Sequence, residues 1–116
     1  MKFPTTVLKN VQYKEYKVDV LIGDYANGGQ AIILLDSQDE SPIATITRWI
    51  EPLMPNHVAI DINNMNQSVV DWLIRNKIIQ EYIIKILVSG YCTYPVYRLH
   101  ENIVKQLENV EIHRTT

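Results

Sequence analysis

Apolar and polar residues alternate along much of the first half of the chain, which is the pattern of β-strands with one buried and one solvated face. Between Tyr16 and Ile22, apolar residues take every second position, with Lys17 and Asp19 between them. The segment 27–29, Asn-Gly-Gly, tolerates positive φ and suits a tight reversal. Runs of this kind, separated by turn-like breaks, predict an antiparallel meander. They cover Tyr16–Ile22, Ala31–Asp36, Pro42–Ile50 and His57–Ile62.

The run Ala31–Leu35 differs from the others because it is apolar on both faces. A strand with two apolar faces is typical of the centre of a sheet that is covered on each side. We therefore expect its neighbours in the meander to be edge strands. One face would pack against a helix, and a partner chain could cover the other.

An amphipathic helix is predicted after the meander. Asn66 is suited to the N-cap of a helix that runs to about Asn76. Its apolar stripe consists of Val69, Val70, Leu73 and Ile74, and such a stripe predicts packing against the sheet. Trp72 lies at the border of this stripe. We expect it to pack in the core, and an exposed binding anchor is the alternative.

The last third of the chain predicts a second hairpin and a short terminal helix. The hairpin would pair Ile78–Val88 with Tyr91–Leu99, although Lys77–Ile86 also fits a helix. Pro95 lacks a backbone donor, which predicts an edge or bulged strand. The segment His100–Glu108 has apolar residues at helical spacing. The expected fold class is α+β, a single domain over 1–116 in which one amphipathic helix packs on an antiparallel meander and a short C-terminal helix follows.

Composition and charge narrow the classes of function. The chain has 116 residues, is 47% hydrophobic and carries a formal net charge of −2. This charge would repel a nucleic acid backbone, so we expect no direct nucleic-acid binding without a local basic patch. The longest apolar-rich stretch, Tyr82–Val88, is too short to span a bilayer. A single cysteine, Cys92, fits a reducing compartment, and we expect a cytoplasmic location.

No arrangement of residues in the sequence predicts catalysis. His57 and Asp61 should share the outer face of the predicted strand His57–Ile62. They lie on either side of Ala59, about 13 Å apart in an extended strand, which is too far for a hydrogen-bonded pair. Cys92 would be a nucleophile only if His57 or His100 came within reach of its thiol, and a structural cysteine is the simpler interpretation. We expect a protein that is not an enzyme and that needs no cofactor or metal.

Tyrosine and arginine residues give the best candidate binding surface. Three tyrosines surround Arg98, and an extended strand would place Tyr91 and Tyr97 on one face and Tyr94 on the other, so at least one row should be exposed. Arg48 lies either at the margin of the sheet or in contact with an anion. The candidate binding residues are Arg48, Trp72, Tyr91, Tyr94, Tyr97 and Arg98.

Several short segments together resemble a family of small proteins of unknown function from bacteria, their phages and mobile elements. These segments are Tyr25–Gly28, Ala31–Ile32, Ala44–Thr47, Val58 with the following asparagines, Trp72–Leu73, Ser89–Tyr91 and Pro95–Leu99. The resemblance departs at Gly29, where a basic residue would be expected, and this weakens an anion-binding role for the first hairpin turn. It implies a fold, and for a small acidic protein of mobile elements it implies counteraction of host defence in the host bacterial cytoplasm.

The leading expectation is a non-enzymatic, anti-CRISPR-like protein that binds and inhibits a host defence effector. One alternative is a sponge for a cyclic nucleotide or a cyclic ADP-ribose-type messenger, with the arginines and tyrosines holding phosphate and base. A small housekeeping interaction protein and a small hydrolase using Cys92 or His57 are further alternatives. We also expect a homodimer that forms through sheet or helix faces.

Overall fold

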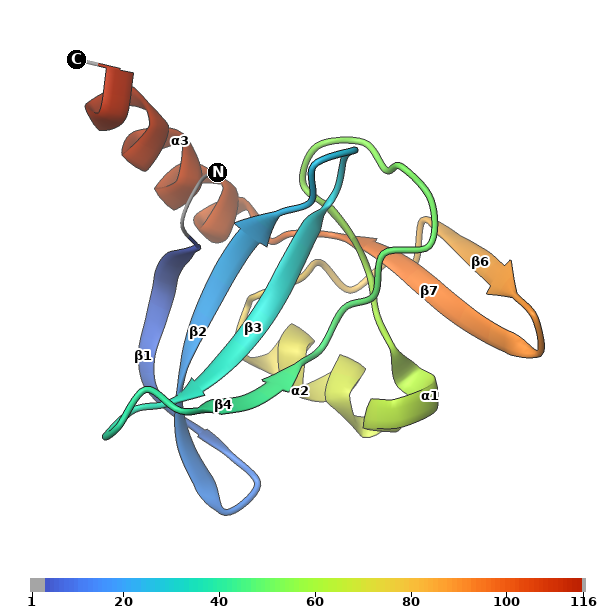
Figure 1. The fold of residues 1–116 in the computed structure, drawn as a ribbon, viewed down its shortest axis with the longest axis horizontal. Coiled ribbons are helices and arrows are strands. Elements are labelled where there is room, and N and C mark those ends of the chain that lie inside the picture. Colours follow the sequence, from blue (N-terminus) through green and yellow to red (C-terminus); the bar gives the residue numbers. More distant parts are fainter. Residues whose placement is uncertain (1–3, 116) are drawn as a thin grey trace.

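The computed structural model describes residues 4–115, and within them the strands form a four-stranded and a three-stranded antiparallel sheet (Figure 1). The first sheet has the order β1-β2-β3-β4, so each strand pairs with the next one along the chain. Its strands are β1 (Thr5–Tyr13), β2 (Tyr16–Asp24), β3 (Gln30–Asp36) and β4 (Pro42–Thr45). The predicted α+β class and the antiparallel meander are confirmed.

Strand β1 was not predicted, and its presence changes the position of β2. Because β1 pairs with β2, β2 is an internal strand, and the expectation that both neighbours of Ala31–Leu35 are edges is wrong for β2. Of the two neighbours of β3, only β4 is an edge strand. The register between β1 and β2 shifts twice, after Thr6 and after Leu8. Such irregularities break the alternation by which a strand is found in a sequence.

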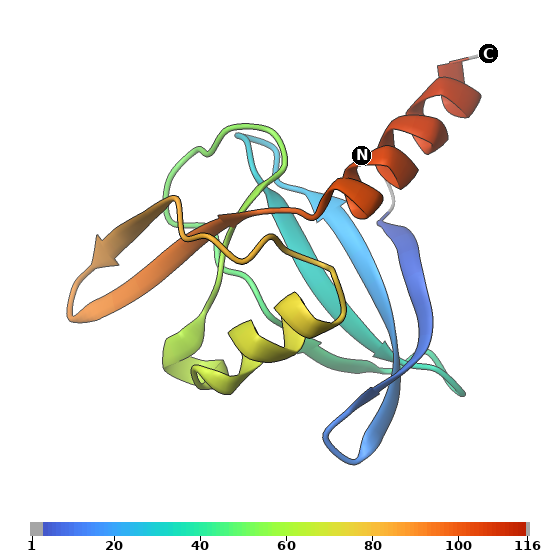
Figure 2. The same cartoon turned by 180° about the vertical axis from the view of Figure 1, so that it is seen from behind.

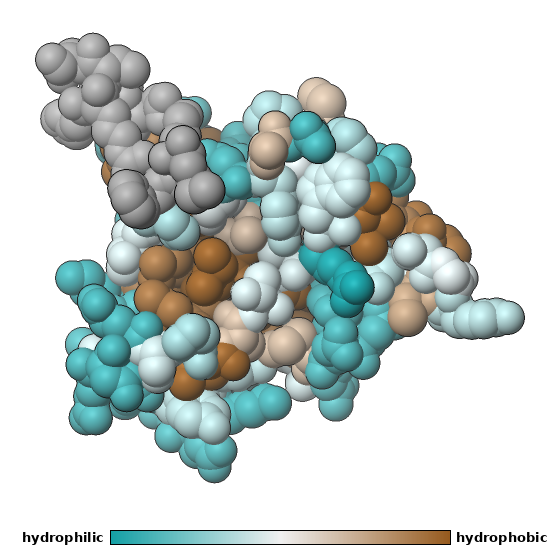
Figure 3. Space-filling view, viewed as in Figure 1, coloured by the Kyte–Doolittle hydropathy of each residue, from teal (hydrophilic) through white to brown (hydrophobic). Residues whose placement is uncertain are grey.

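The two faces of β3 are covered to different degrees. Ile32 and Leu34 are fully buried and face the core, as predicted for a central strand. Ile33 and Leu35 on the opposite face are half-buried. Figure 3 shows hydrophobic surface over this outer face of the first sheet.

The second sheet contains β5 (His57–Ala59), β6 (Lys85–Ser89) and β7 (Cys92–Arg98) in the order β5-β7-β6. The prediction that His57–Ile62 continues the meander is therefore wrong, because β5 pairs with β7. The run Pro42–Ile50 is also shorter than predicted and ends as a strand at Thr45. Beyond it, Thr47 forms an isolated bridge with Ile60, which links the two sheets.

Pro95 lies in the central strand of the second sheet, so the prediction of an edge strand is wrong. In a β-strand, the N–H and C=O of one residue point to the same side. The Pro95 carbonyl accepts a hydrogen bond from the N–H of Ile60 (2.9 Å), which places the missing proline donor on the β5 side. Because the missing donor lies on the β5 side, Pro95 removes no hydrogen bond between β7 and β6. On the β5 side, regular pairing stops at Ala59.

The inner face of the first sheet is covered by helix α2 (Ser68–Arg75), which Figure 2 shows crossing in front of the sheet. The predicted packing is confirmed: Val69, Val70 and Leu73 are buried. The predicted N-cap is wrong, because the capping position is Gln67 and its side chain makes no capping hydrogen bond. A short helix, α1 (Ile62–Met65), precedes it, and Asn66 ends α1 with a positive φ of 74°.

Residues 76–84 form neither the predicted helix nor a regular strand. Lys77 has a positive φ of 55°, and the N–H of Ile78 bonds to the carbonyl of Leu73, which ends the helical pattern. The chain then runs beside β7, where Ile79 bridges Leu99. The predicted hairpin with β7 is therefore regular only from Lys85.

The terminal helix α3 (Glu101–Thr115) is longer than predicted, and residue 116 lies outside the described part of the chain. The segment contains no glycine or proline to end it sooner. Ile103 and Val104 are buried in its first turns and join the main core. The core thus contains residues from both sheets, from α2 and from α3.

Candidate binding surface on the second sheet

Trp72, one of the predicted binding residues, belongs to the core. It is only 7% exposed, and its ring meets Tyr13 edge to face with centroids 4.9 Å apart. Its indole Nε1 donates a hydrogen bond to the carbonyl of Gln12 (2.8 Å). The apolar ring and its polar group are both satisfied inside the protein, so Trp72 is no surface anchor.

The predicted tyrosine row on β7 is buried except at the hairpin turn. Tyr94 and Tyr97 point to opposite faces of β7 and are 5% and 7% exposed. Burial is the main reason why the pKa of each hydroxyl is raised. Tyr91 lies in the two-residue turn between β6 and β7 and is fully exposed. Both faces of β7 are covered, because Tyr97 packs in the main core and Tyr94 packs in a smaller cluster with Ala59, Leu87 and Val96.

The two predicted arginines remain accessible to solvent to different extents. Arg98 is half-buried and forms an ion pair with Glu101 (3.3 Å), so part of its charge is already neutralised. Arg48 is exposed, and its charge acts on the hydroxyl of Tyr94. Neither arginine is therefore held with two tyrosines in a nucleotide clamp.

Basic groups gather on one face of the second sheet. The register places His57 opposite Arg98 and Lys85 opposite Val96, so all three basic side chains lie on the same face. The pKa of His57 is lowered first by burial and then by the charges of Arg98 and Lys85. A small apolar cluster around Tyr94 lies on the same face.

A row of exposed apolar side chains runs along β6 and the residue before it. Ile84, Ile86 and Val88 are 45%, 59% and 69% exposed, and we call these three residues the β6 patch. Leu87, between the last two, is buried on the opposite face. No strand among residues 4–115 pairs with the outer side of β6. Figure 3 shows hydrophobic surface at this end of the molecule.

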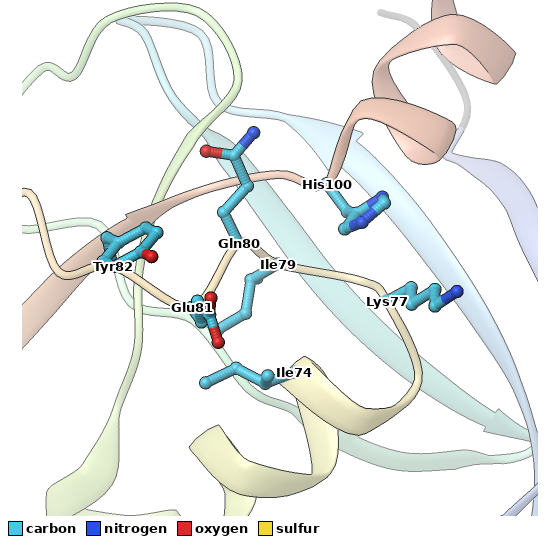
Figure 4. A pocket seen from close by; sticks show the side chains of 7 residues that line it. All are labelled: Ile74, Lys77, Ile79, Gln80, Glu81, Tyr82 and His100. Carbon is cyan, nitrogen blue, oxygen red and sulfur yellow. The ribbon is translucent and has the colours of Figure 1, made fainter.

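A pocket of about 460 Å³ lies between the end of α2, the segment after it and the start of α3. Its apolar residues are Ile74 and Ile79, and its polar rim contains Lys77, Gln80, Glu81, Tyr82 and His100. Figure 4 shows Tyr82 and Lys77 on opposite sides of Ile79, with the Lys77 side chain extending away from Tyr82. The pocket has the size of a small-molecule site. Its charged groups are of both signs.

The side chains that were considered for catalysis, those of His57, Asp61 and Cys92, lie at separate positions in the structure. Asp61 is buried and accepts hydrogen bonds from the backbone N–H (3.4 Å) and side-chain Nδ2 (2.8 Å) of Asn64, so the expectation that it lies on an outer face with His57 is wrong. Asp61 instead caps the first turn of α1, which requires an inward carboxylate. Cys92 is half-buried and is one of the groups that raise the pKa of the Tyr94 hydroxyl. Within residues 4–115, no group of three or more His, Cys, Asp or Glu side chains could hold a metal ion.

The acidic loop between β3 and β4 is organised by its own hydrogen bonds. Asp36 Oδ1 accepts from the N–H of Gln38 (2.8 Å), and Asp39 Oδ1 accepts from the N–H of Ser41 (2.9 Å). Hydrogen bonds from Ser41 hold the pKa of Asp39 below its usual value. These carboxylates serve the turn itself, which agrees with a solvated loop.

Sequence reasoning missed the β6 patch although its residues were part of a predicted hairpin. Ile84, Ile86 and Val88 are alternate residues and would lie on one face of an extended strand, but Leu87 makes the other face apolar as well. The signal was therefore that of a buried strand. Only the strand order, with β7 in the centre, shows that β6 is the edge.

Comparisons of the chain with protein families, with curated proteins and with solved structures return no match. Among residues 4–115 there is also no helix long and apolar enough to cross a membrane.

Proposed function

We propose that this chain is a non-enzymatic binding protein that attaches to another protein through the free edge of β6. The observation that carries the proposal is the exposure of Ile86 and Val88 on a strand whose outer side pairs with no other strand of residues 4–115. An edge of this kind binds an extended segment by adding it to the sheet, where backbone hydrogen bonds give affinity and alternate side chains give specificity.

The two edges of the first sheet are protected in ways that β6 is not. β1 has two register shifts, and its exposed side chains include Lys9, Asn10 and Gln12. β4 is four residues long and begins with Pro42. Bulges, charged or polar residues, prolines and short length are the usual means of preventing edge pairing. β6 is also short and exposes Lys85 and Ser89, but its other exposed residues, Ile86 and Val88, are apolar, which favours an edge that pairs.

The two faces beside this edge suggest the chemistry of the segment that would bind. Ile86 and Val88 would contact apolar side chains on one face of an added strand. Lys85 lies on the other face, together with Arg98 and His57. A target strand with apolar residues on one face and acidic residues on the other would match both surfaces.

The resemblance to small proteins of phages and mobile elements supports a defence effector as the target, and inhibition of that effector as the result. The chain would occupy a surface that the effector needs for its substrate or its subunits. The acidic net charge of −2 does not favour competition through direct binding to nucleic acid. A housekeeping interaction protein would use the same edge. The identity of the bound target distinguishes this alternative from an inhibitor of a defence effector.

The test is binding to, and inhibition of, a panel of purified CRISPR effector complexes. We expect one complex to co-elute with the protein and to lose nuclease activity. The Val88→Lys variant should abolish both effects, because it places a charge in the β6 patch. Met54→Lys is the matched control, since Met54 is 66% exposed and lies outside the second sheet. Inhibition that survives Val88→Lys would exclude the β6 edge, and no inhibition of any complex would exclude this target class.

A second candidate function, the nucleotide sponge, is favoured by the size of the 460 Å³ pocket. Tyr82 is 75% exposed there and could stack on a base, while Lys77 or His100 could meet a phosphate. The carboxylate of Glu81 on the same rim would repel an anion. Calorimetry with cyclic nucleotides and cyclic ADP-ribose would show heat that Tyr82→Ala abolishes; no heat with any of them rejects this candidate.

A further inference from the structure

We infer that β6 pairs with β6 of a second copy of the chain, antiparallel, with the two-fold axis beside Leu87. This inference rests on the proposed function only in taking the β6 edge as a pairing edge, and it names a second copy as an occupant of that edge. It is independent of the identity of any target.

The hydrogen bonds of β7 determine which groups of β6 face outward. The carbonyl of Pro95 accepts from Ile60 N–H, and the carbonyl of Thr93 accepts from Asn63 Nδ2, each at 2.9 Å. Both carbonyls thus point away from β6. In an antiparallel pair, two opposite residues either bond to each other or both point away.

The residues of β6 opposite these two positions therefore direct their backbone groups to the free edge. The register pairs Ile86 with Pro95 and Val88 with Thr93. The N–H and C=O of Ile86 and of Val88 point outward, and no described residue accepts or supplies their hydrogen bonds. These are the same residues whose side chains are most exposed in the β6 patch.

A two-fold axis beside Leu87 satisfies all of these groups at once. It places Ile86 of each copy opposite Val88 of the other, and these pairs exchange hydrogen bonds through both N–H and both C=O groups. Leu87 then faces Leu87 of the other copy as a non-bonded pair. This is consistent with Leu87 lying opposite Tyr94, where its backbone groups face β7.

Other antiparallel registers satisfy fewer groups. An axis at Ile86 would place Val88 opposite Ile84, whose N–H already bonds to the carbonyl of Val96 (2.8 Å). An axis at Val88 would place Ile86 opposite Gly90, which lies in the hairpin turn and has a φ of +61°. The register centred on Leu87 is the one that the backbone favours.

The side chains also fit this register. Ile86 and Val88 form two apolar cross-strand pairs on one face, and such pairs stabilise a sheet. On the other face, Lys85 lies opposite Ser89 of the second copy, so the two lysines do not face each other directly. A β6 strand is thus complementary to itself in hydrogen bonding, apolar contact and charge. Pairing with a second copy covers the edge that a target would need, so the two kinds of binding exclude each other.

Disulfide trapping tests the register in a Cys92→Ala background, with circular dichroism to verify folding. Hydrogen-bonded antiparallel pairs have Cα atoms about 5.5 Å apart, within the range of disulfides. I86C mixed with V88C should form a covalent dimer under mild oxidation, and each variant alone should form much less. A mixture that crosslinks no better than the single variants, or stronger crosslinking of I86C alone, would overturn the register.

Light scattering tests the pairing itself on the unmodified chain of 13.5 kDa. We expect the mass of two chains at micromolar concentration, the mass of one chain for Val88→Lys, and no change for Met54→Lys. A monomeric wild-type protein would overturn the inference even if Val88→Lys abolished target binding. Conversely, a dimer that inhibits no effector would leave the inference standing and contradict the proposed target.

Discussion

The hydroxyl of Tyr13 is buried without a hydrogen-bond partner among residues 4–115, although its ring packs well against Trp72. A buried polar group without a partner costs stability, because it loses its hydrogen bond to water on folding. We expect Tyr13→Phe to raise the free energy of unfolding by about 1 kcal/mol, measured by urea denaturation. Trp72→Phe should lower it, since the bond to Gln12 and part of the packing are lost. A decrease for Tyr13→Phe would show that the hydroxyl is satisfied.

His57 should make stability depend on pH in a defined direction. Burial and the charges of Arg98 and Lys85 lower its pKa in the folded state, so the unfolded chain binds the proton more readily. The contribution of His57 to stability is complete above its ordinary pKa of about 6.5 and is lost as pH falls through that value toward the lower folded pKa. His57→Gln should reduce this loss in denaturation curves recorded between about pH 7.5 and 5.

Nuclear magnetic resonance titration of His57 separates the causes of this shift. Arg98→Gln removes the second cause and should raise the pKa of His57 toward its ordinary value. An unchanged titration curve would mean that Arg98 contributes nothing and that burial and Lys85 account for the shift. A pKa above the ordinary value in the wild-type protein would contradict the prediction.

At the scale of elements, the segments with a clean periodic pattern were predictable from the sequence. The β2–β3 hairpin, the apolar stripe of α2 and the pairing of β6 with β7 are confirmed. β1 was not, because its two register shifts interrupt the alternation of side chains. The N–H of Asn10, which has a positive φ of 56°, bonds to Asp19 Oδ1 (3.1 Å), so a residue of another strand stabilises this irregularity. A pattern that depends on a neighbouring strand cannot be found by periodicity alone.

The glycines of the two hairpin turns should respond differently to substitution. A Cβ at Gly28, where φ is +110°, would lie 2.6 Å from the carbonyl oxygen of Leu53. Gly90 has a φ of +61° and no atom within 4 Å of such a Cβ. We expect Gly28→Ala to cost at least about 2 kcal/mol of unfolding free energy and Gly90→Ala about 1 kcal/mol. Thermal and urea denaturation measure both, and equal losses would show that the backbone near Leu53 can move.

For the molecule as a whole, the order of the strands and the segments packed on them determine which candidate residues are exposed. The sequence predicted a tyrosine surface on this strand, but Tyr94 and Tyr97 are buried on its two covered faces. That cover comes from segments far away in sequence, which alternation within one strand does not reveal. The β6 patch became visible only when β7 was placed between β5 and β6.

Thr47 connects the two sheets and should matter beyond its size. It is buried, its Oγ1 accepts from the N–H of Ile32 (3.1 Å) and contacts the Tyr25 hydroxyl (3.2 Å), and its backbone bridges Ile60. Thr47→Val keeps the volume but leaves the Ile32 donor unpaired, so we expect a loss of about 1 to 3 kcal/mol in unfolding free energy. Thr45→Val, at an exposed position of β4, is the control and should change stability little. Equal effects of the two variants would contradict the role of Thr47.

The order of strands in the second sheet also determines when the protein can fold during synthesis. Each strand of the first sheet pairs with its neighbour in the chain, but Ala59 of β5 must wait for Val96 of β7. The core likewise needs Leu99 and Ile103, which the ribosome adds only after all seven described strands. A nascent chain halted after α2 therefore carries a first sheet with an incompletely covered inner face, and exposed apolar surface of this kind is prone to aggregation and is handled by chaperones. Premature termination anywhere before residue 99 should consequently yield fragments that the cell degrades, rather than a shorter working protein.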